Sequence, residues 1–92
     1  MAKYQILYWR EIPAQVKAYD GVRPISRLLP GRYQLEIDRL AMEEGLAGTE
    51  EYLNQWHWTA KLDRKGSAEE VLESLVEELI AEWDPKIRAK DS

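Results

Sequence analysis

Residues 8–16 read YWREIPAQV and connect the first two strands that the sequence predicts. On its N-terminal side, Tyr4 to Arg10 is rich in aromatic and β-branched residues and predicts a β-strand. Ile12-Pro13 breaks that run, because proline lacks an N–H donor and restricts the residue before it. Gln15 to Tyr19 resumes as a second strand. The stretch therefore predicts two consecutive strands, with an indole, a guanidinium and a primary amide held close together at the break.

A third strand follows directly. Asp20-Gly21 is typical of a two-residue hairpin, since a type I′ turn needs positive φ at both central positions. Residues 22–28 form the returning strand. Pro24 within it indicates a sheet edge or a bulge.

Helical signals begin at Pro30-Gly31, where apolar residues recur on one face until Gly45 ends the helix in a left-handed conformation. Thr49 then predicts the N-cap of a single turn. Asn54 to Leu62 alternates apolar and polar residues, which predicts a fourth strand with Trp56, Trp58, Ala60 and Leu62 on its apolar face.

The last helix carries the strongest pattern. Ser67 and Glu70 form a capping box at its start, and an apolar stripe runs from Val71 to Trp83 with glutamates on the solvated side. Asp84-Pro85 is expected to end it.

These elements follow the order β-β-β-α-β-α. We expect an α+β two-layer sandwich: a mostly antiparallel four-stranded sheet with two helices on one face. Residues 1–84 form a single domain, and residues 85–92 a flexible C-terminal tail.

Composition excludes several classes of protein. The 92 residues suffice for one domain. They include no cysteine, which rules out disulfides, thiolate metal sites and a cysteine nucleophile. No apolar run approaches the roughly 20 residues of a membrane span, and no signal segment is seen, so a cytoplasmic protein is expected. No cofactor and no metal are expected.

Charge is unevenly distributed along the chain. The net charge is −4, with +3 in residues 1–40 and −7 in residues 41–92. This dipolar pattern argues against nucleic acid as a partner and is compatible with a local anion site.

Two tryptophans and a group of arginines are the candidate binding residues. Trp56 and Trp58 share one strand face; they either pack under the last helix or leave one ring exposed as a stacking platform. Arg23 and Arg27 share a face of the third strand, near Arg10 and Arg32. They either form an anion fork or shield a sheet edge from other chains.

No catalytic set can be assembled from the sequence. The single histidine, His57, has no partner identifiable from the local sequence and is interpreted as a surface residue. The serines have no adjacent base, so no catalytic residue is assigned.

The stretch from Tyr4 to Val16 resembles a small bacterial domain family described as virulence factor. The similarity continues through Leu29-Pro30, the first helix, residues 45–48 (GLAG), Tyr52-Leu53, Gln55-Trp56, Trp58 and residues 66–71 (GSAEEV).

The resemblance implies an adaptor or assembly role, without an established activity. Members occur as stand-alone proteins and as a module of a longer conserved virulence factor (the C-type proteins), beside an iron–sulfur scaffold domain. Since this chain has no cysteine, any link to iron–sulfur assembly would be indirect, through a partner.

The preferred hypothesis is a non-catalytic protein-interaction module that uses the sheet around Trp9, Arg10 and Gln15. Tryptophan and arginine dominate interface energetics, which supports this choice. The alternative is a domain, or minor enzyme, that binds an anionic planar ligand in an aromatic and arginine pocket. Whether a second copy covers the basic edge strand, giving a homodimer, is left open.

Overall fold

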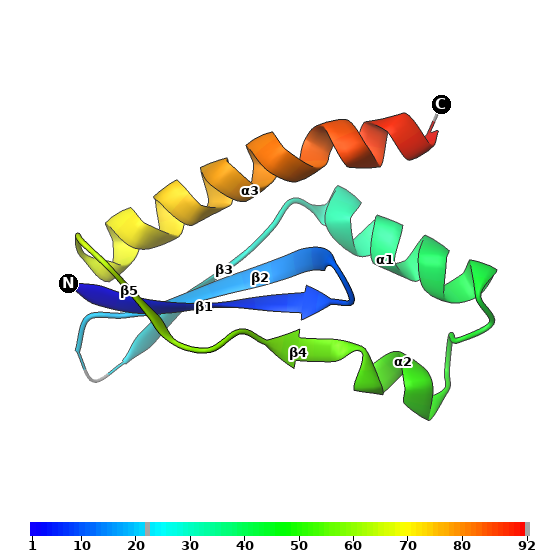
Figure 1. Ribbon diagram of the computed structural model, residues 1–92, viewed down its shortest axis with the longest axis horizontal. Coiled ribbons are helices and arrows are strands. Elements are labelled where there is room, and N and C mark those ends of the chain that lie inside the picture. Colours follow the sequence, from blue (N-terminus) through cyan, green and yellow to red (C-terminus); the bar gives the residue numbers. More distant parts are fainter. Residues whose placement is uncertain (22, 92) are drawn as a thin grey trace.

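A computed structural model describes residues 1–21 and 23–91, with side chains through Ile87 (Figure 1). It confirms the α+β class with an antiparallel sheet. Strands lie in the order β3-β2-β1-β4, and β5 also pairs with β1. The elements are β1 Ala2–Trp9, β2 Ile12–Tyr19, β3 Pro24–Leu28, α1 Gly31–Glu43, α2 Glu50–Asn54, β4 Trp56–Trp58, β5 Leu62–Arg64 and α3 Ala68–Asp91.

The break at Ile12-Pro13 is a β-bulge and does not interrupt the strand. Leu7 pairs with Gln15, whereas Tyr8 pairs with Pro13, so Ala14 is the extra residue on β2. A bulge tolerates proline because one ladder bond is already missing there. The prediction that the second strand starts only at Gln15 is therefore wrong; β2 starts at Ile12.

The third strand is confirmed as an edge strand that pairs with β2 alone. It begins at Pro24, and Val22, where the sequence predicts its start, lies outside the described residues.

The fourth strand is corrected, because residues 54–62 do not form one continuous strand. β4 and β5 each contain three residues and pair with successive parts of β1. Between them the Thr59 hydroxyl accepts a bond from the Ile6 N–H, over 3.0 Å, in place of a backbone carbonyl. The expected apolar face is lost past this point, since Leu62 is 51% exposed.

Local signals at the helix ends are confirmed. After α1, Gly45 has φ of +69°, its N–H donates to the Met42 carbonyl, and the Leu46 N–H donates to the Ala41 carbonyl. These two bonds form a Schellman motif. Thr49 caps α2, by accepting from the Tyr52 N–H.

The capping box at the start of α3 is also present. Ser67 and Glu70 exchange bonds between side chain and backbone N–H in both directions.

The prediction that Asp84-Pro85 ends the last helix is wrong: α3 continues through Pro85 to Asp91. Proline inside a helix costs about 3 kcal/mol. Tertiary contacts offset that cost, because Ile87 is buried in the core and Asp84 is bonded to α1. The domain boundary at residue 84 stays a prediction.

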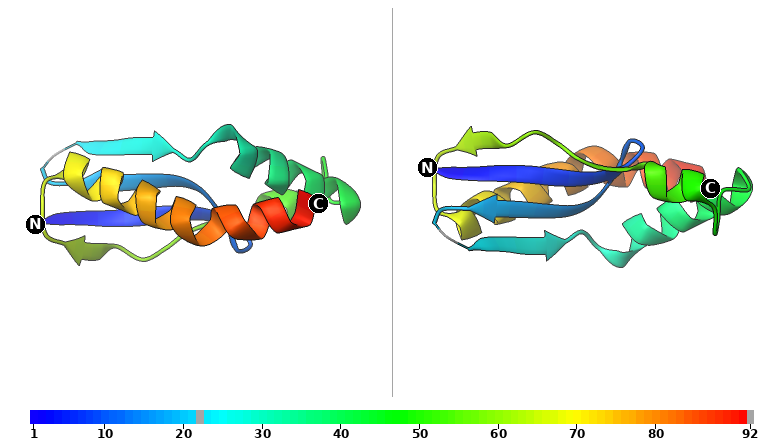
Figure 2. Two further views of the ribbon diagram at one scale, coloured as in Figure 1. Left: turned by 90° about the horizontal axis from the view of Figure 1, so that it is seen from above. Right: turned by 90° about the horizontal axis from the view of Figure 1, so that it is seen from below.

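The two faces of the sheet have different surroundings. Helix α3 runs along one face for the length of the sheet, and α1 and α2 lie at the end where β1 and β2 are joined (Figures 1 and 2). Ile6, Val16 and Ala18 from the sheet and Leu72 and Leu75 from α3 are buried in the core. Viewed from below, the other face lies in front of α3, with only α2 and part of α1 at its end (Figure 2, right).

Candidate interaction surface

The uncovered side of the sheet carries a row of side chains that crosses four strands. Gln15 pairs with Leu28 on one side and with Leu7 on the other, and Leu7 pairs with Trp58. Residues directly opposite one another in a sheet point to the same face. This row, together with the neighbours on the same face, is called the open face below: Gln5, Leu7, Gln15, Lys17, Tyr19, Leu28, Trp56, Trp58 and Lys61.

Apart from Gln15 the row is apolar, and its two ends are accessible. Leu28 is 76% exposed and Trp58 is 38% exposed. Beside them Leu7, Gln15, Leu28 and Trp56 line a hollow of about 210 Å³, which α1 closes at one end through Gly31 and Gln34. Large apolar side chains gathered around a shallow hollow are typical of a binding surface.

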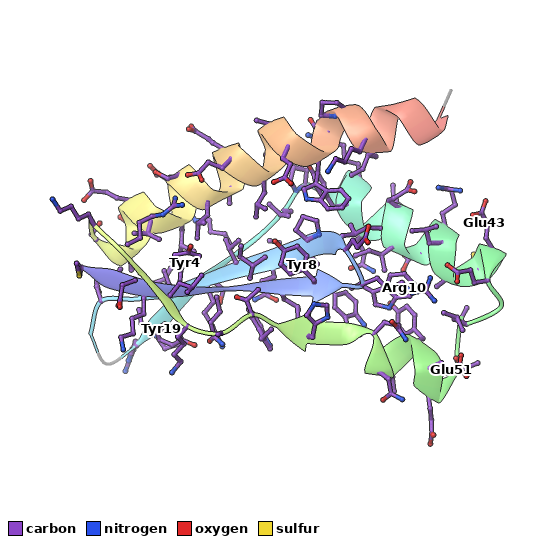
Figure 3. All side chains as sticks on the ribbon, viewed as in Figure 1. Tyr4, Tyr8, Arg10, Tyr19, Glu43 and Glu51 are labelled. Atoms are coloured by element: carbon purple, nitrogen blue, oxygen red, sulfur yellow. The ribbon has the colours of Figure 1, made fainter. Side chains whose placement is uncertain are left out.

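Lysines and aromatic rings form a connected group next to the row. Lys17 Nζ lies 4.3 Å from the ring centroid of Trp58 and 5.5 Å from that of Tyr19. Lys61 Nζ lies 4.9 Å from the Tyr19 ring. Such contacts hold ammonium groups over aromatic faces. The open face is therefore basic at this end, where Tyr19 is labelled in Figure 3.

Gln5 fixes the arrangement of this group. Its amide Nε2 donates to the Thr59 carbonyl over 2.9 Å, and its Oε1 accepts from the Tyr19 hydroxyl over 2.8 Å. With both ends of the amide engaged, the Tyr19 ring is held in place beneath the two lysines. The lysine–aromatic group is thus ordered before any partner arrives.

The structure separates the two tryptophans from the last helix. Because Trp58 pairs with Leu7 and Trp56 with Trp9, both rings lie on the face opposite α3. The interpretation that they pack under the last helix is wrong. Trp56 is half-buried, with its ring edge-on to Tyr52 at 6.2 Å between centroids, whereas Trp58 keeps an accessible surface.

Trp9 is part of the core. Its side chain is fully buried, its indole Nε1 donates to the Tyr52 carbonyl over 3.0 Å, and its ring lies 5.7 Å from that of Tyr52. Because the Trp9 side chain is fully buried, a partner on the open face would not contact it directly.

Arg10 lies at the tip of the β1–β2 turn, with φ of +55°, a value uncommon for a residue other than glycine (Figure 3). Its guanidinium forms an ion pair with Glu44 and stacks 5.0 Å from the Trp9 ring. It lines a hollow of about 450 Å³ shared with Glu11, Glu44 and Trp83. Arg10 and Gln15 are therefore in different hollows.

Arg23 and Arg27 lie apart from the tryptophans. Arg27 pairs with Val16 and so points to the α3 side, where it lines a hollow with Glu73 and Glu77. Arg23 is exposed and precedes β3. The proposed anion fork stays a prediction.

His57 is an exposed residue on the α3 side. Its ring stacks on Tyr8 at 5.8 Å between centroids, and its Nδ1 lies 3.3 Å from the Gln55 carbonyl.

Burial, followed by the charge of Glu82, raises the pKa of Tyr8, so this phenol stays protonated near neutral pH.

Sequence reasoning missed the lysine–aromatic group. Lys17 and Tyr19 alternate with Val16 and Ala18, so a strict application of the two-residue period to β2 would have placed both beside Gln15. Lys61 carries no such signal, because it lies in the segment between β4 and β5.

The described part of the chain contains neither a metal-binding group nor a membrane-spanning helix. No group of three histidine, aspartate or glutamate side chains is placed there to hold a metal ion. Nor is any helix in residues 1–21 and 23–91 long and apolar enough to cross a membrane.

The comparison with protein families identifies the class. The chain matches the family described as virulence factor over residues 7–87, which is most of its length. This protein therefore belongs to the virulence factor domain family. No curated protein and no solved structure matches it.

Proposed function

We propose that this chain is a non-catalytic protein-interaction module and that its partner is an acidic segment of another protein, docked on the open face. The observation that carries the proposal is the partly exposed Trp58 on the edge strand β4, held beneath Lys17 on the uncovered face of the sheet. An indole and an adjacent cation on an accessible surface are typical of interface hot spots.

Two parts of the open face define the partner's chemistry. The hollow beside Leu7, Leu28 and Trp56 accepts an apolar side chain. The ammonium groups of Lys17 and Lys61 then favour carboxylates a few residues away along the partner. A segment that combines one large apolar residue with neighbouring aspartates or glutamates meets both requirements.

Charge distribution supports an acidic partner over a basic one. The open face is basic, while the outer side of α3 carries the glutamates of the acidic half of the chain. A basic partner would therefore be drawn to the helix and repelled from the tryptophans.

The ligand-binding alternative draws less support. That alternative needs an arginine and an aromatic ring in one pocket. The hollow that Arg10 shares with Trp83 meets this requirement, but its charge does not suit an anion. The Arg10 charge is already opposed there by Glu44, and Glu11 lines the same hollow. A planar anion would have to displace these carboxylates.

Family resemblance favours an adaptor among larger assemblies, including an indirect connection to iron–sulfur assembly. In that proposal the cluster would be held by a partner, since this chain has no cysteine. The cytoplasm remains the expected location.

The test is selection of peptides from a random display library on the immobilised domain. We expect enrichment of peptides in which acidic residues flank a large apolar residue. A selected peptide should bind roughly 30-fold more weakly to Trp58→Ala, because a hot-spot truncation costs about 2 kcal/mol. Binding should also weaken in Lys17→Glu and Gln15→Ala.

Lys86→Glu is the matched control, since Lys86 also lies over a tryptophan ring, that of Trp83, but on α3 and outside the open face. Enrichment of basic peptides, enrichment that Trp58→Ala leaves unchanged, or no enrichment at all would each contradict the proposal. Quenching of tryptophan fluorescence by a small anionic metabolite, lost in Arg10→Ala, would favour the alternative.

A further inference from the structure

Strand β3 forms one whole edge of the sheet. A single hydrogen bond shows which of its backbone groups bond to β2 and which point outward. The Leu29 N–H donates to the Ala14 carbonyl over 3.0 Å. In an antiparallel ladder, residues alternate between bonding to the neighbouring strand and pointing away from it. Ile25 and Arg27 therefore bond to β2, while the backbone of Ser26 and Leu28 faces outward.

The outward edge keeps nearly all of its bonding capacity. Ser26 and Leu28 present both an N–H and a carbonyl, and Pro24 at the start of the strand presents a carbonyl only. Both views in Figure 2 show β3 as the outermost strand on its side, with no other element beyond it. An edge of this kind is a template for another strand.

The opposite edge is poorly suited to pairing. It consists of β4 and β5, which are three residues each and are separated where the Thr59 side chain replaces a ladder bond. Short and interrupted edges resist strand addition. Within the described residues, strand pairing is thus directed to β3.

We propose that two copies of this chain pair antiparallel through β3 about a two-fold axis at Ser26. In this register the two Ser26 residues exchange N–H···O bonds. The Leu28 N–H of each copy donates to the Pro24 carbonyl of the other. Proline is tolerated because only its carbonyl is required there.

The side chains beside β3 favour a second copy over an unrelated strand. A two-fold interface uses the same patch twice, so the patch must be complementary to itself. Arg27 lies in a hollow with Glu73 and Glu77, which gives both signs of charge on one patch. Ile25 and Leu28 add exposed apolar surface.

Across the axis, Arg27 of one copy would lie opposite Ile25 of the other, on the side that carries both α3 helices. Each guanidinium would then sit between two helices that present Glu73 and Glu77. In that position Arg27 would form ion pairs between the two copies, and it would not act as a charge that keeps other strands away from the edge.

Pairing would also place two open faces side by side on one continuous sheet. A partner with two acidic segments would then bind both copies at once and gain avidity. The dimer rests on β3 and the proposed function on the open face, so either can fail without the other.

The experiment is sedimentation equilibrium of the whole 92-residue chain over a wide concentration range. The monomer has a mass of 10.8 kDa, and we expect the apparent mass to double as concentration rises. Ser26→Pro should stay at the monomer mass, because it removes an outward N–H that bonds to nothing in β2. Ser26→Ala, which keeps that N–H, should behave as the unmodified chain does.

A charge-exchange pair keeps the test decisive if Ser26→Pro fails to fold. Arg27→Glu alone and Glu73→Lys/Glu77→Lys alone should each lose the dimer, and an equal mixture of the two should restore it. Monomer mass for the unmodified chain at every concentration would overturn the proposal. So would a dimer that Ser26→Pro and Arg27→Glu leave unchanged.

Discussion

The Tyr33 hydroxyl donates to Asp84 Oδ1 over 2.8 Å and joins the first turn of α1 to α3, one residue before Pro85. Arg32 completes the contact by donating to both Asp84 oxygens, over 3.0 and 2.8 Å. This three-residue junction lies where the sequence predicts the end of the last helix. Together with the buried Ile87, it offsets the cost of the proline inside α3.

Asp84→Ala should lower the free energy of unfolding by about 1–3 kcal/mol, because it removes the acceptor of a buried phenol. Arg32→Ala should cost less, since the guanidinium is solvated and Asp84 keeps its bond to Tyr33. Urea denaturation followed by circular dichroism measures both. Equal losses in the two variants would contradict the role given to the phenol.

Stability should fall at alkaline pH through Tyr33. Burial first, and then the bond to Asp84, raise the pKa of this phenol well above its ordinary value of 10.0. The folded state therefore holds the proton more tightly than the unfolded state. The contribution is complete below pH 10 and is lost as pH rises above that value.

The free energy of unfolding should consequently decrease with pH above about 10, and less steeply in Tyr33→Phe. Denaturation curves between pH 8 and pH 11 provide the measurement. Tyr8→Phe should also make the decrease with pH less steep, because burial raises the pKa of Tyr8 in the folded state. An identical slope in Tyr33→Phe and the unmodified chain would rule out the assignment.

Trp9 and Trp58 should respond very differently to truncation. Trp9→Ala should cost about 3–5 kcal/mol, since it empties a fully buried site and removes the bond to Tyr52. Trp58→Ala should cost roughly 1–2 kcal/mol, because its ring is partly solvated and Lys17 lies over it. Thermal unfolding of the two variants distinguishes the roles, and a larger loss in Trp58→Ala would show that its ring is structural.

Gly45→Ala should destabilise the domain by about 1–2 kcal/mol, because Gly45 has φ of +69° and alanine is strained there. Gly31→Ala is the matched control. It lies at the start of α1, and an added Cβ at either glycine meets no atom within 4 Å. A gain of stability in both variants would mean that the Schellman motif does not depend on glycine.

Much of the fold could be predicted because its signals are local. The capping box of Ser67 and Glu70, the end of α1 at Gly45 and the cap at Thr49 each depend on atoms within a few residues of one another. Such contacts form in the same way whatever the rest of the chain does.

The candidate site was predicted only in part. Gln15, Trp56 and Trp58 share one face, but Trp9 lies in the core, and Arg10 and Arg27 line other hollows. Alternation along a strand shows which residues share a face, without telling which face a helix will cover.

Local patterns in the chain are enough to predict the antiparallel α+β framework and the caps of its helices, and residues 7–87 match the virulence factor domain family. The two-residue hairpin predicted at Asp20-Gly21 is wrong, because Tyr19 pairs with Pro24 and four residues connect the two strands. Three features come from long-range packing: α3 covers the face opposite Trp58, Lys17 lies over that ring, and the helix continues past Pro85. The physical reason is the same in each case. These outcomes depend on contacts between residues tens of positions apart, whose free energies exceed the local preferences that the sequence displays.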